Sequence, residues 1–125
     1  MRTAAMTING REHILCFSAR VVRDCAERYG EWNGVFAAMS EGTEVQKLDE
    51  SIWLISRLMD AGARYAKANG IECPKALTPD ELYDSCSLSD FFMLRNKITE
   101  TVKAGQQTTV EVEAPKNGMA TPAVS

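Results

Sequence analysis

The sequence predicts a mainly α-helical protein of the α+β class, in which an N-terminal β-hairpin packs on a helical bundle built around one long helix. Two observations support this prediction. Asn9-Gly10 separates two short segments that alternate in polarity, which is the strongest two-residue hairpin signal. From 44 to 69, apolar residues recur at spacings of three and four, as in an amphipathic helix. The 125 residues suffice for one domain, which we expect over 1–105, followed by a flexible tail over 106–125.

The hairpin prediction specifies both strands and their register. Asn and Gly accept the positive φ angles of a tight turn, so strands are expected near 3–8 and 11–17. A two-residue turn pairs Ile8 with Arg11 and Met6 with His13. This register gives the hairpin one apolar face, formed by Ala4, Met6, Ile8, Leu15 and Phe17. We expect helices to cover that face.

Two helices are expected before the long one. Ser18 is a candidate N-cap for a helix over 19–29, which Gly30 ends. We expect its exposed side to carry i,i+4 ion pairs between Arg20 and Asp24 and between Arg23 and Glu27. A second, shorter helix over 33–40 is predicted by the spacing of Trp32, Val35, Phe36 and Met39.

The long helix and those after it begin at recognisable caps. Thr43 and Gln46 form a capping box that begins the helix over 44–69. Its predicted buried stripe is Val45, Leu48, Ile52, Ile55, Met59, Gly62 and Ala66, widened by Leu54, Leu58 and Tyr65. Thr78-Pro79-Asp80-Glu81 predicts a short helix through about Cys86. Ser89 is the expected cap of a last helix, whose buried face is Phe91, Leu94, Ile98 and Val102.

The segment 106–125 contains no leucine or aromatic residue and includes Pro115, Gly118 and Pro122. Such a segment buries too little apolar surface to offset the entropy of ordering, so we expect a flexible tail. The alternation of valine with polar residues over 108–113 leaves open that this part adds a strand to a partner.

Composition disfavours several classes of partner. The net charge of −3 and the pI near 5.2 give no field that would attract a phosphate backbone, so we expect no nucleic acid partner. The longest apolar runs, such as 52–55 and 91–94, are far shorter than the roughly 18 residues of a membrane span. The N-terminal segment lacks the apolar core of a signal peptide, so a cytoplasmic location is expected.

The chain offers little for catalysis or metal binding. The chain has four cysteines, without a C-x-x-C pair, and one histidine: the cysteines are Cys16, Cys25, Cys73 and Cys86. We therefore expect no bound metal and no cofactor. We expect the four thiols to be reduced, with a disulfide as the alternative. His13 falls on the apolar face of the hairpin, where we expect a hydrogen-bonded structural imidazole. His13 and Cys16 would point to opposite faces of a strand and cannot pair. We expect no catalytic residues; an enzyme using Cys16 or Cys25 remains the alternative.

Aromatic residues are the remaining candidates for a functional surface. We single out Trp32, Trp53, Phe91 and Phe92 as candidate protein-binding residues, since aromatic side chains often anchor interfaces. Adjacent phenylalanines cannot both face one core. Trp53 has a structural alternative, in which it packs on the helix over 33–40 or stacks under Arg57.

The order of elements resembles a known family. It begins with the segment Met6-Thr7-Ile8-Asn9-Gly10, followed by Leu15-Cys16-Phe17-Ser18, which leads into a helix that ends at Tyr29-Gly30, and then by a long helix and a final one. This order is similar to that of the tail assembly chaperones of long-tailed bacteriophages and prophages. The similarity covers about residues 3–104 and includes no diagnostic motif. It implies a protein of the bacterial host cytoplasm that binds the tape measure protein and keeps it soluble during assembly of the tail tube.

The same resemblance implies further partners and states. The tail tube protein is a possible second partner, and a homo-oligomer is expected, because several copies raise the effective concentration along a long partner. Members of this family can also be extended by a translational frameshift near the C-terminus. A different class of function stays open: a small DNA-binding or other phage regulatory protein that uses Arg20, Arg23 and Arg28 of the helix over 19–29.

Overall fold

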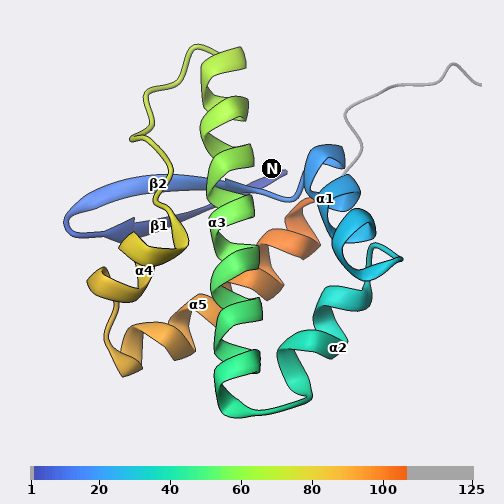
Figure 1. Ribbon diagram of the computed structural model, residues 1–125. Helices are drawn as coiled ribbons and strands as arrows, with labels where there is room; N and C mark the ends of the chain where they lie inside the picture. The colour runs from blue at the N-terminus through green and yellow to red at the C-terminus, as the bar shows by residue number, and fades with distance from the viewer. Residues whose placement is uncertain (1, 107–125) are drawn as a thin grey trace, which may run out of the picture.

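The structure, a computed structural model, describes residues 2–106, so nearly all of the predicted tail lies outside the described part (Figure 1). An antiparallel hairpin of two strands packs on five helices, and the fold is mainly α, as predicted. The elements are β1 (Thr3–Ile8), β2 (Arg11–Cys16), α1 (Ala19–Tyr29), α2 (Gly34–Ser40), α3 (Glu44–Ala68), α4 (Pro79–Ser85) and α5 (Leu88–Ala104).

The hairpin has the predicted register. Ile8 pairs with Arg11 and Met6 with His13, around a turn in which Asn9 and Gly10 have φ angles of 53° and 76°. β2 ends at Cys16, one residue earlier than expected. Cys16 pairs with Thr3, the first residue of β1, so Phe17 has no partner in the ladder and the chain turns into α1.

The long helix α3 is the centre of the fold, and the hairpin crosses it (Figure 1). Leu54, Ile55 and Leu58 of α3 are fully buried. At Gly62 the backbones of α3 and β2 meet directly, because an added Cβ would lie 1.7 Å from the carbonyl oxygen of Ile14. The same residue is also held by the linker after α3, where the backbone N–H of Ile14 donates to Cys73 Sγ at 3.5 Å.

Capping explains where the helices begin. The predicted capping boxes of α3 and α4 are both formed, by Thr43 with Gln46 and by Thr78 with Glu81. The prediction for α5 was wrong: its N-cap is Ser87, because Asp90 stands three residues later and completes a capping box. The helix therefore includes Leu88. α2 begins at Gly34, and α3 ends at Ala68, each within one residue of its prediction.

Two predictions about α1 and α3 were wrong in their contacts. Neither of the i,i+4 ion pairs expected on α1 is among the ion pairs of the described residues; instead Asp24 pairs with Arg57 of α3 at 3.6 Å. Val45, assigned to the buried stripe of α3, is 65% exposed. It stands in the first turn of the helix, where no neighbouring element covers it.

Candidate protein-binding surface

Exposed apolar side chains gather where α4 leads into α5. Seven large apolar side chains are exposed among the described residues, namely Trp32, Val45, Ile71, Tyr83, Leu88, Phe92 and Met93. Four of these seven fall within residues 83–93. Leu88, Phe92 and Met93 are the most exposed of the four, at 73%, 60% and 61%. We call these three residues the α5 patch.

The α5 patch lies on the side of α5 that faces away from the core. The opposite side is formed by Leu94 and Ile98, each 2% exposed. Leu88 and Phe92 are one turn apart, and Met93 directly follows Phe92, so the three share the outward half of the helix. Burying a side chain of this size contributes about 1.5–3 kcal/mol, which the patch forgoes in the isolated chain. Contiguous exposed apolar residues of this kind indicate a contact surface.

The elements that carry the patch are firmly anchored. Leu82 of α4 is fully buried, and the Ser87 capping box fixes the start of α5. Tyr83 of α4 donates its hydroxyl hydrogen to Asp49 of α3. Burial, together with this hydrogen bond, raises the pKa of Tyr83, so the phenol stays a neutral donor around neutral pH. The patch is therefore presented by helices that are already in place.

The structure separates the four aromatic residues proposed from sequence. Phe92 belongs to the α5 patch, whereas Phe91 is half-buried and packs against the core. Trp32 is 41% exposed, precedes α2, and contacts Phe17 and Phe36, each with ring centroids 6.0 Å apart.

Trp53 stacks with a different arginine from the one predicted. Its ring meets Tyr29 edge-on at 5.7 Å, and the guanidinium that stacks on it, at 4.5 Å, belongs to Arg28 and not to Arg57. It is therefore a half-buried residue that joins α1 to α3. The sequence reasoning missed Leu88 and Met93. With Ser87 as the N-cap, Leu88 falls within α5, and at 3.6 residues per turn neither Leu88 nor Met93 shares the face of Leu94.

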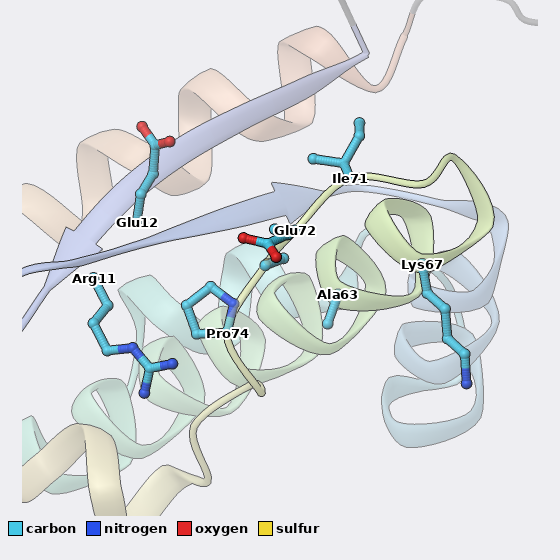
Figure 2. Close-up of a pocket in the computed structure, with 8 residues that line it drawn as sticks. Arg11, Glu12, Ala63, Lys67, Ile71, Glu72 and Pro74 are labelled. Carbon is cyan, nitrogen blue, oxygen red and sulfur yellow. The ribbon is translucent and has the colours of Figure 1, made fainter.

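A cleft of about 760 Å³ lies between β2, the end of α3 and the linker that follows (Figure 2). Arg11, Glu12, Lys67 and Glu72 line it, together with Ala63, Ile71, Cys73 and Pro74. The thiol of Cys73 accepts the hydrogen bond from Ile14, and no histidine lines the cleft. Arg11 and Lys67 lie at opposite ends in Figure 2. The Cys73 thiol that lines the cleft is thus engaged with the backbone of β2.

The single histidine is buried but lacks the hydrogen bond that we expected. His13 is 3% exposed, and its Nδ1 atom has no partner among the described residues. Burial lowers the pKa of His13, and nearby Arg11 lowers it further. The register places His13 and Cys16 on opposite faces of β2, so they do not form a catalytic pair.

The four cysteines are free thiols. Cys16 and Cys25 are buried, while Cys73 and Cys86 are half-buried. Burial raises the pKa of Cys25 to about 11, with a smaller contribution from Asp24. A thiol with that pKa is almost wholly protonated near neutral pH, which disfavours nucleophilic chemistry at this position.

Metal sites and membrane spans are two further possibilities for residues 2–106. They contain no group of three or more His, Cys, Asp or Glu side chains that could hold a metal ion. No helix in this part of the chain is long and apolar enough to span a bilayer.

Comparison with protein-family models, with curated proteins and with solved structures finds no match to this chain. The resemblance to tail assembly chaperones therefore rests on the order of the sequence elements and on the short segments that begin and end them. The structural feature that bears on function is the surface described above.

Proposed function

We propose that this chain is a phage or prophage tail assembly chaperone, which binds the tape measure protein and keeps it soluble in the host cytoplasm while the tail tube assembles. On this proposal the chain acts by binding and not by catalysis. The observation that supports it is the α5 patch, in which Leu88, Phe92 and Met93 are each at least 60% exposed on an anchored helix. A patch of this shape suits the apolar stripe of a partner helix.

The size of the patch is consistent with reversible binding. Three side chains on one helix give a small contact, and small contacts form transient complexes. A long helical partner offers many similar stripes, so several copies of the chaperone can cover it although each copy holds it weakly. Polymerising tail tube protein can then displace the copies one after another.

The alternative of DNA binding through α1 gains no support from the contacts of its arginines. Arg28 pairs with Glu50 at 3.3 Å and stacks on Trp53, so it is occupied within the fold. Arg20 and Arg23 are exposed, and Glu27 follows Arg23 by one turn of the same helix. Two exposed arginines give little of the positive field that a duplex requires.

Co-expression with the tape measure protein encoded by the same genome tests the proposal. We expect the tape measure protein to become soluble and to co-purify with the wild-type chain. Phe92→Ser/Met93→Ser should lose both effects, whereas the matched control Thr99→Ser/Glu100→Gln, at exposed positions further along α5, should retain them. A tape measure protein that stays insoluble with the wild-type chain, or soluble with the patch variant, would refute the proposal.

A further inference from the structure

We propose that the partner segment held by the α5 patch is an amphipathic helix whose apolar stripe is flanked by lysine and arginine. This inference rests on the proposed function and adds the charge of the partner to it. The evidence for it is the acidic residues in the same stretch of chain as the patch. Their negative charge restricts which charges a partner that covers the patch can have.

The stretch of chain that contains the patch has acidic residues and no basic ones. Residues 76–94 contain four carboxylates and no lysine, arginine or histidine, although the whole chain has a net charge of only −3. The carboxylates are Asp80, Glu81, Asp84 and Asp90, and all four are exposed. None of them takes part in the ion pairs of the described residues.

The neighbouring helix α3 adds a carboxylate near α4. Asp49 of α3 lies against α4, where it accepts the hydrogen bond from Tyr83. The nearest basic residues along the chain, Lys75 and Arg95, stand outside the acidic stretch on either side. A helix laid across Leu88 and Phe92 therefore meets a stretch of chain that has carboxylates and no cation, which favours flanking cations over flanking anions.

The same charges argue against other occupants. A second copy of the chain would bring a net charge of −3 to an acidic surface. The segment beyond residue 106 carries Glu111 and Glu113 against one lysine, Lys116, so it also lacks the complementary charge. Anionic lipid surfaces and nucleic acids are disfavoured for the same reason. A basic amphipathic helix satisfies both the apolar patch and the carboxylates.

Two synthetic helical peptides with one shared leucine stripe provide the test. One peptide carries lysine and the other glutamate at the flanking positions, and each is titrated with the full chain by fluorescence anisotropy. We expect the lysine peptide to bind about tenfold more tightly or better, with a preference that shrinks as added salt shortens the screening length. Phe92→Ser should abolish binding of the lysine peptide.

Neutralising two carboxylates separates the role of charge from the role of the apolar patch. Asp80→Asn/Asp84→Asn should weaken the lysine peptide by about fivefold, the effect of losing two exposed ion pairs. Glu31→Gln/Glu41→Gln removes the same charge in the loops that flank α2, which lies on the other side of α3 from α4 in Figure 1, and should leave the affinity unchanged. An equal loss in both double variants would overturn the inference.

Three further outcomes would overturn the inference, and the first leaves the proposed function standing. If both peptides bind equally and both depend on Phe92, the patch binds helices without regard to charge. If light scattering shows a wild-type oligomer that Phe92→Ser dissociates, the occupant is a second copy. If Val110→Ser/Val112→Ser tightens peptide binding, the occupant is the chain's own C-terminal segment.

Discussion

Replacing Gly62 with alanine tests the contact on which the arrangement of hairpin and long helix depends. An alanine Cβ would lie 1.7 Å from the carbonyl oxygen of Ile14, whereas contacts shorter than 3.0 Å essentially never occur. The backbones of α3 and β2 would therefore have to separate by about 1.3 Å, the difference between these two distances. The atoms in the way belong to a strand, so no side-chain rotation can relieve the clash.

Two effects of opposite sign compete in this variant. Alanine improves helix propensity by about 1 kcal/mol. Overpacking costs about 1–3 kcal/mol, and a backbone clash belongs at or above the upper end of that range. We expect a net loss of about 2 kcal/mol in the free energy of unfolding, which corresponds to a fall of about 8–16 °C in Tm.

Urea denaturation followed by circular dichroism and tryptophan fluorescence measures the change. Arg64→Ala, two residues along on the exposed side of α3, is the control, since it removes only an exposed ion pair with Asp60 and should shift stability by less than about 0.5 kcal/mol. If Gly62→Ala instead stabilises the protein by about 1 kcal/mol, the change in stability is explained by helix propensity alone. The close contact with Ile14 would then not exist in solution.

Three other changes have predictable effects on stability. Since burial holds the pKa of His13 below its unfolded value of about 6.5, the free energy of unfolding should fall as pH drops below about 6.5. His13→Leu should flatten that slope in urea titrations at several pH values, and an unchanged slope would assign it to other groups. Thr43→Ala removes the capping bond to Gln46 and should cost about 1 kcal/mol; a neutral result in thermal melts would mean that water replaces the cap. Phe92→Ser/Met93→Ser should change stability by less than about 0.5 kcal/mol, and a larger loss in the same melts would show that the patch belongs to the core.

Local rules predicted the elements well because the relevant interactions are themselves local. Asn9-Gly10 determines the turn and hence the whole hairpin register, and the Thr43 and Thr78 boxes fix two helix starts within four residues of sequence. The start of α5 was mispredicted because two serines compete as the cap. Ser87 is followed three residues later by an aspartate, and Ser89 by a phenylalanine. Aspartate at the third helical position closes the box as glutamate or glutamine would, so the cue for Ser87 is present in the sequence.

Contacts between elements far apart in sequence were not predictable from the pattern. Periodicity placed Trp53 beside Arg57 along one helix, yet Arg28 of α1 reaches its ring. The same limit applies to Asp24, which forms its ion pair with Arg57 of α3 and not with Arg20 of its own helix. Val45 follows the apolar period but is exposed, because the period of a helix specifies a face and not the extent of its neighbours.

The α5 patch is a different case, because its residues lie outside the core. Leu94 and Ile98 complete the core from one side of the helix, and the aromatic contact of the outward side is that of Phe92 with Phe91, whose ring centroids are 6.2 Å apart. Leucine, phenylalanine and methionine at those positions therefore do not serve the stability of the isolated chain. Their exposure, in a stretch whose carboxylates form no ion pair within the described residues, supports the proposal that a second polypeptide covers them.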